Sequence, residues 1–186
     1  MADRKVKGTM LLNLVRMIRA NKSQNWNKYL KPEDWEVINK RILPSEWYPL
    51  EVFQRCGVAI FQVLAQANLD IVRQSGRMQG KKLFENVYKS VVISQDPAAT
   101  LSRFVTVYNQ FFNFSTVRFE NAGMSHVQIH HDYDTSQHPG TVPYCYQLMG
   151  ILDVLVEVAG GKNIKIELKA KQWERAPTTI FDITWE

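Results

Sequence analysis

The chain has 186 residues, of which 45% are hydrophobic and 22% charged, a balance typical of one folded domain and not of a disordered segment. Its net charge of +5 comes from scattered residues, without the stripe of basic and aromatic side chains expected of a nucleic-acid interface. No apolar run reaches the roughly 18 residues that a membrane-spanning helix needs. We therefore expect one cytoplasmic domain over residues 1–186, with no nucleic-acid partner and no membrane span.

The cysteine content points to a reducing compartment. Cys56 and Cys145 are the two cysteines of the chain, and each lies within an apolar helical pattern. This setting is typical of buried free thiols and predicts no disulfide framework.

Helical periodicity dominates the first half of the chain. It predicts a first helix over 10–20 with Thr9 as its N-cap, and a second from Pro32 to residue 42. The aromatic segment 45–49 is predicted to be a turn. The next helix is predicted to run from residue 50 to about 73 and to be the central buried helix of the domain.

Two more helices are predicted before the pattern changes. Gly76 and Gly80 are interpreted as the ends of a connection. Helices are then expected over 83–93 and 97–112.

Alternation of apolar and polar residues begins after residue 113. It predicts strands over 114–121 and 126–133, a helix over 143–161, and strands over 164–171 and 178–185. Each strand has one apolar face and one polar face, which indicates a sheet covered on one side only. We predict an α+β domain whose N-terminal helices pack on one face of a four-stranded antiparallel sheet, formed by two hairpins separated by a helix.

The last third of the chain resembles a known superfamily. The resemblance rests on a helix with Gly150 at its centre and Gly160-Gly161 at its end, followed by a hairpin. This ending is similar to that of a sensor superfamily that includes heme nitric-oxide/oxygen-binding domains, vinyl-reductase-like domains and TRAPP trafficking subunits. The whole chain also resembles an uncharacterised myxobacterial paralogous family, in Val6-Lys7-Gly8, Trp47-Tyr48-Pro49 and the Trp185 ending. The resemblance implies a ligand-binding or trafficking-like domain.

The heme and zinc motifs of that superfamily are incomplete in this chain. Heme domains carry a proximal histidine on the helix before the first hairpin, but the corresponding segment, 98–112, has no histidine. Their Tyr-x-Ser-x-Arg motif corresponds to 133–137, which lacks the arginine. Tyr108 could ligate iron, but a tyrosine among apolar neighbours is typical of a core. Vinyl-reductase-like domains carry several cysteines near the final hairpin, and none follows Cys145. We expect no cofactor.

Histidines and acidic residues cluster between His126 and Asp134. On a strand His126 and His130 lie about 13 Å apart, too far to share one ion. His130 and Asp132 lie about 7 Å apart along the strand and are weak metal candidates, because two ligands make a poor site. We interpret His126 and His130 as surface residues and His131 as a residue at the edge of the core. Surface histidines of this kind can titrate near neutral pH.

No catalytic motif is present. The one pairing that suits nucleophilic catalysis joins Cys145 with His138 or His131, but the apolar helix around Cys145 is typical of a structural thiol. We predict that the protein is not an enzyme.

These observations favour a non-enzymatic signalling or adaptor module. We expect a homodimer with protein partners, which uses the exposed aromatic turn at Trp47 and Tyr48 as its interaction surface. The alternative is a sensor that binds a small apolar ligand or lipid in a pocket between helices and sheet, and a divergent heme or metal protein is less favoured. By resemblance, seven residues could line such a pocket, although the same residues could simply fill the core: Phe61, Leu64, Phe104, Tyr108, Phe112, Tyr146 and Met149.

Overall fold

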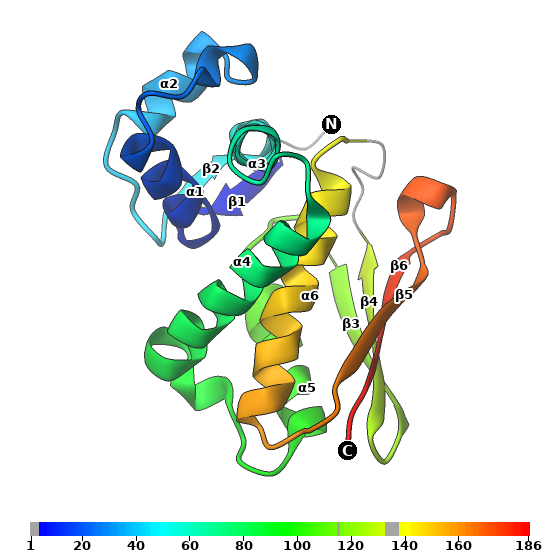
Figure 1. Ribbon diagram of the computed structural model, residues 1–186. Coiled ribbons are helices and arrows are strands. Elements are labelled where there is room, and N and C mark those ends of the chain that lie inside the picture. The colour runs from blue at the N-terminus through cyan, green and yellow to red at the C-terminus, as the bar shows by residue number, and fades with distance from the viewer. Residues whose placement is uncertain (1–3, 115, 133–137) are drawn as a thin grey trace.

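The computed structural model describes residues 4–114, 116–132 and 138–186 (Figure 1). Helices and a short two-stranded ribbon form the N-terminal part: α1 (Gly8–Ala20), α2 (Pro32–Ile38), α3 (Leu50–Val63), β1 (Lys5–Lys7) and β2 (Trp47–Pro49). Strands β1 and β2 pair antiparallel, with Val6 opposite Tyr48. The predicted turn over 45–49 is therefore partly a strand. The ribbon was missed because three residues are too few to show alternation.

Two boundaries of the first helices differ from the prediction. Thr9 lies inside α1 and donates its hydroxyl to the carbonyl of Pro44 at 3.1 Å, so it is not the N-cap. Helix α2 begins at Pro32 as predicted but ends at Ile38 instead of residue 42. The guanidinium of Arg19 donates a hydrogen bond to the carbonyl oxygen of Ile38. In a longer helix this oxygen would accept from a backbone N–H of the next turn.

The predicted helix from residue 50 to 73 is in fact two helices. α3 ends at Val63, and α4 (Leu69–Lys82) follows after a turn. Gln66 and Ala67 in the turn have φ values of 51° and 57°, which no helix continues through. The side chain of Asn68 then caps α4 by accepting from the backbone N–H of Asp70 and Ile71.

Gly76 and Gly80 lie within α4 and do not bracket a connection. Helix α4 packs closely against α6 (Thr141–Val158), and the glycines permit the close approach. A Cβ on Gly76 would lie 2.1 Å from the carbonyl oxygen of Gln147, and one on Gly150 of α6 would lie 2.0 Å from that of Arg73. Two helix backbones therefore touch where the sequence suggests a loop.

The segment between α4 and α5 is irregular. The predicted helix over 83–93 is a π-helical turn, η2 (Leu83–Val87), followed by a 3-10 turn, η3 (Lys89–Val91). Helix α5 (Pro97–Tyr108) begins where predicted, because Asp96 accepts from the backbone N–H of Ala99 at 2.9 Å.

The predicted sheet and fold class are confirmed. Four antiparallel strands lie in the order β3-β4-β6-β5, with α6 between the two hairpins: β3 (Thr116–Gly123), β4 (His126–Asp132), β5 (Lys165–Ala170) and β6 (Thr179–Thr184). Ile129 lies opposite Phe181 on the inner face, and both are buried. Helices α5 and α6 contact this face, whereas α1 to α3 lie farther along the molecule (Figure 1).

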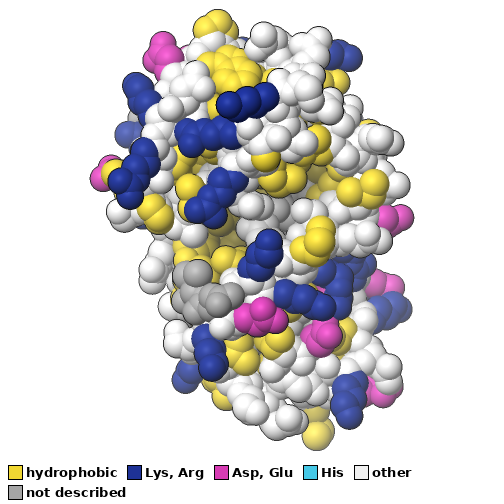
Figure 2. All heavy atoms as spheres, turned by 60° about the vertical axis from the view of Figure 1, so that its left-hand side comes forward, with side chains coloured by type: hydrophobic (Ala, Val, Ile, Leu, Met, Phe, Trp, Pro, Cys, Tyr) yellow, Lys and Arg dark blue, Asp and Glu magenta, His cyan; other side chains and the backbone are white. Residues whose placement is uncertain are grey.

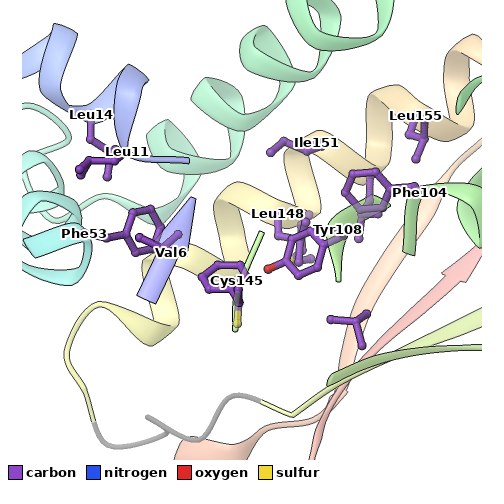
Figure 3. Close-up of a cluster of buried hydrophobic side chains, with 14 of the residues drawn as sticks. Val6, Leu11, Leu14, Phe53, Phe104, Tyr108, Cys145, Leu148, Ile151 and Leu155 are labelled. Atoms are coloured by element: carbon purple, nitrogen blue, oxygen red, sulfur yellow. The ribbon is translucent and has the colours of Figure 1, made fainter. Parts of the chain in front are cut away.

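The central helix is α6 and not the segment predicted to have that role. Twelve of its eighteen residues are buried, against five of fourteen in α3. Leu148, Ile151 and Leu155 of α6 belong to the same buried cluster as Phe104 and Tyr108 of α5 (Figure 3). None of the helices in the described part of the chain combines the length and hydropathy that a membrane crossing requires.

Candidate functional site

A pocket of about 300 Å³ opens between α1, α3, α4 and the start of α6. On the face that carries α1 and α4, Figure 2 shows a hollow with hydrophobic side chains in it and lysine and arginine side chains nearby. The residues that line it are mostly apolar, and the polar ones are uncharged: Leu14, Met17, Phe53, Gln54, Gly57, Ile60, Phe61, Leu64, Ala65, Ile71, Val72, Gln74, Ser75, Met78, Gly140, Thr141, Pro143, Tyr144 and Gln147.

Helix α4 presents two different faces. Ile71, Ser75 and Met78 recur at helical spacing along the pocket, and Ile71 and Met78 are 43% and 63% exposed. The arginines of α4 face away from the pocket: Arg73 makes two hydrogen bonds of 2.9 Å to the carboxylate of Asp153 on α6. Helix α4 therefore holds its two arginines against α6 and leaves an uncharged face toward the pocket.

Gly57 of α3 keeps part of the pocket open. A Cβ placed on it would meet no atom of the described residues within 4 Å, unlike those on the glycines of the α4–α6 contact. A glycine inside a helix lowers helix stability, and no close backbone approach requires one here. The feature that Gly57 does provide is space in the wall of the pocket.

A second cavity, beside α5, is almost filled. It measures about 40 Å³, little more than the roughly 30 Å³ that one water molecule takes in the liquid. Aromatic rings occupy this region, with the ring centroids of Phe104 and Phe112 each 5.7 Å from that of Tyr108.

Three polar groups meet at the edge of this aromatic cluster. The hydroxyl of Tyr108 lies 2.9 Å from Nε2 of His131 on β4 and also hydrogen-bonds to the hydroxyl of Tyr144 on α6. Burial lowers the pKa of His131 to about 3, so its imidazole is neutral near pH 7. Tyr144 lines both cavities and therefore connects the larger pocket to the sheet.

The structure divides the seven predicted pocket residues into three groups. Phe61 and Leu64 line the larger pocket, and Phe104 and Tyr108 line the small cavity. The other three line neither cavity and lie in or against the core: Phe112, Tyr146 and Met149. The larger pocket lies among helices, since none of the strand residues that the structure describes lines it.

The predicted interaction surface at Trp47 and Tyr48 lies on β2. Trp47 is 40% exposed, and the ammonium of Lys7 lies 4.0 Å from the centre of its ring. Tyr48 is half-buried, and its hydroxyl accepts a hydrogen bond from the backbone N–H of Leu43 at 2.9 Å.

The histidines of β4 have separate surroundings. On the outer face, Nε2 of His126 lies 2.8 Å from Asp182, and Nε2 of His130 lies 3.1 Å from Glu120. His131 is fully buried and not at the edge of the core as predicted. Among the described residues, no three histidine, cysteine or acidic side chains are grouped to hold a metal ion. His130 and Asp132 stay weak metal candidates, and segment 133–137 lies outside the described residues.

Both thiols are buried in apolar surroundings. Burial raises the pKa of Cys56 and that of Cys145 to about 12. A thiol is a nucleophile as its thiolate, so neither cysteine is activated in this structure.

Comparison with protein families identifies the family of the chain. Residues 34–186 match the family described as protein of unknown function (DUF2378). The chain belongs to this family. No curated protein matches the sequence of this DUF2378 member, and its myxobacterial origin stays a prediction.

Solved structures show that the DUF2378 chain has the fold of H-NOX domains. It is similar to the H-NOX protein from S. oneidensis in the Fe(II)NO ligation state, with a TM-score of 0.65, 13% identity, and 97% and 99% of the two chains covered. For the Fe(II) unliganded H-NOX protein from K. algicida the TM-score is 0.63 at 11% identity, and 97% and 96% of the two chains are covered. For a mutant of the T. tengcongensis H-NOX protein the TM-score is 0.61 at 13% identity, and 97% of each chain is covered. At such identities the likeness shows the fold alone.

The residues of the DUF2378 chain do not fit a heme beside α5. This helix precedes the first hairpin and carries no histidine. The cavity next to it measures about 40 Å³, because Phe104, Tyr108 and Tyr144 occupy the space. No residue of α5 lines the larger pocket. A porphyrin beside α5 would have to displace part of the aromatic core.

The buried imidazole of His131 predicts a pH-dependent stability. Its pKa is about 3 in the folded protein and about 6.5 in the unfolded chain. Between these values the unfolded state binds one more proton, so the free energy of unfolding falls as the pH is lowered through this window. For this group alone we expect a loss of about 1 kcal/mol between pH 7.5 and pH 5.5.

Urea unfolding at these two pH values measures that loss. The variant His131→Gln keeps a hydrogen-bonding side chain beside Tyr108 but does not titrate. It is expected to lose less stability than the wild type between the two pH values. Equal losses in the two proteins would show that the imidazole is not buried in its neutral form.

Proposed function

We propose that this chain is a non-enzymatic signalling module that binds a small apolar molecule in the pocket between α1, α3, α4 and α6. The observation that carries the proposal is the pocket itself: about 300 Å³, mostly apolar, with a few polar groups in its walls. Small-molecule sites have this composition and begin at about this size. The H-NOX-like fold, which other proteins use to hold a ligand inside, supports the same function.

The position of the pocket suits signalling. Its walls come from α1 and α3 of the N-terminal part and from α4 and α6. Leu64 and Ala65, at the joint between α3 and α4, are also part of the wall. A ligand that fills the pocket contacts helices on both sides of this joint, so its binding favours one arrangement of these helices over others.

A pocket-filling variant tests the proposal. Gly57→Leu places a side chain into the open space beside α3 and is expected to leave the protein folded. 1-Nonanol at a hundredfold excess over its dissociation constant is expected to stabilise the wild type by about 2.7 kcal/mol. The same addition should leave the variant almost unchanged, because its pocket is occupied. Chemical unfolding with and without 1-nonanol measures both effects.

The control is Trp47→Ala, which removes an apolar side chain of β2 that does not line the pocket. This variant is expected to respond to 1-nonanol as the wild type does. Stabilisation of the Gly57→Leu variant to the wild-type extent would place the ligand elsewhere. No stabilisation of the wild type by any small apolar molecule would contradict the proposal.

A second candidate function is that of an adaptor that pairs with a copy of itself or with another protein. The observation that favours it is an apolar surface at the turn before α3, where Leu43 is 41% and Trp47 is 40% exposed. Native mass spectrometry of fresh protein reports the subunit number and any carried ligand together. A dimer without extra mass favours the adaptor, and a mass increase of a few hundred daltons per chain favours the sensor.

A further inference from the structure

We infer that the ligand of the pocket is an uncharged amphiphile, with an apolar body and one hydrogen-bonding group such as an amide, ketone or alcohol. The inference rests on the proposed function and specifies its ligand class. It also states what the pocket rejects: the carboxylate of the same size and shape.

The first argument is the charge of the walls. No lysine, arginine, aspartate or glutamate lines the pocket within the described part of the chain. The basic residues of α4 nearest to it are turned away, since Arg73 pairs with Asp153, and Arg77 donates to Glu157 at 2.7 Å. An ionised group taken into the pocket would lose its water and meet no opposite charge, which is costly.

The second argument is the supply of uncharged hydrogen-bonding groups. Gln54 of α3 and Gln74 and Ser75 of α4 line the pocket from two helices. Across the described residues these three side chains make no hydrogen bond to the protein. Gln147 of α6 is held in place, because its Nε2 donates to Oε1 of Gln79 at 2.7 Å. An amide, ketone or hydroxyl inside the pocket can therefore exchange hydrogen bonds with water for hydrogen bonds with the walls.

The exposed cations around the hollow do not change this preference. Figure 2 shows lysine and arginine side chains on the surface near the pocket, where water and salt screen their charge. They can attract an anion to the surface, but they do not replace the water that its carboxylate loses inside the walls.

The volume sets the size of the ligand. At about 30 Å³ for each water-sized group, the pocket of about 300 Å³ holds roughly ten non-hydrogen atoms. Nine-carbon amphiphiles are therefore suitable probes. Nonanamide and nonanoate form a matched pair, because the primary amide and the carboxylate differ in charge and hardly in shape.

Isothermal titration calorimetry of the full chain at pH 7.5 tests the inference. We expect nonanamide to bind at least tenfold more tightly than nonanoate, and Gly57→Leu to abolish the binding of nonanamide. Binding of nonanoate as tight as that of nonanamide would overturn the inference and leave the apolar pocket in place. Binding of neither probe, nor of 1-nonanol, would overturn the proposed function itself.

Discussion

Replacing Gly150 by alanine is expected to lower the free energy of unfolding by about 3 kcal/mol, at the upper end of what overpacking usually costs. The added Cβ would lie 2.0 Å from the carbonyl oxygen of Arg73 and 2.8 Å from the backbone nitrogen of Arg77. Both contacts are to backbone, so no side chain can rotate away, and α4 has to move off α6. Equilibrium unfolding in urea measures the change.

The same substitution at Gly57 is the matched control. Both glycines lie inside helices, but Gly57 faces open space. Gly57→Ala is expected to raise the free energy of unfolding by about 0.5–1 kcal/mol, because alanine is the better helix former. Opposite signs at the two positions would confirm the close α4–α6 contact. A mild effect at Gly150, similar to that at Gly57, would contradict it.

Replacing Asp34 by alanine is expected to destabilise the protein by about 3 kcal/mol, the lower end for a broken buried ion pair. Asp34 is fully buried at the start of α2 and accepts two hydrogen bonds, of 2.8 and 2.7 Å, from Arg55 of α3. It also accepts from the backbone N–H of Lys31 at 2.8 Å. The hydrogen bond to Asp34 raises the pKa of Arg55, so the variant would keep a partly buried cation without this partner.

The neighbouring acid provides the control. Glu33 lies 3.6 Å from the same guanidinium, but its side chain is 57% exposed. Glu33→Ala is therefore expected to change the free energy of unfolding by no more than about 0.5 kcal/mol. Thermal unfolding of the two variants side by side reads out the difference. Equally small losses of stability in the two variants would mean that the ion pair of Asp34 with Arg55 does not stabilise the contact between α2 and α3.

The sheet could be predicted from the sequence because its chemistry is local. Strand β4 alternates between buried and partly exposed residues, and in β5 the exposed Lys165 and the buried Ile166 show which way the strand faces. The start of α5 was also predictable, since Asp96 and Pro97 act within one turn of the chain.

The helix contacts could not be predicted in the same way. Gly76 and Gly80 look like loop residues until α6 is seen to lie against them. The turn between α3 and α4 depends on Gln66 and Ala67 adopting positive φ, although neither residue type favours it. In these places tertiary packing outweighs local preference.

The pocket was only partly foreseen, because a pocket and a core use the same residue types. Phe61 and Leu64 line the pocket, whereas Met149 fills the core. The signal that was missed lies on α4, where Ile71 and Met78 repeat at helical spacing and are 43% and 63% exposed. An exposed apolar stripe of this kind indicates a binding surface more directly than a list of aromatic residues does.

The methionine methyl groups offer the most direct measurement of the pocket. The chain has six methionines, of which Met17 and Met78 line the pocket, Met149 lies in the core and Met124 is fully exposed. In protein labelled with ¹³C at the methionine methyls, titration with 1-nonanol is expected to shift the resonances of Met17 and Met78. Those of Met124 and Met149 should stay in place. Shifts confined to Met124 or Met149, or no shift at saturating 1-nonanol, would contradict a ligand site between α1, α3, α4 and α6.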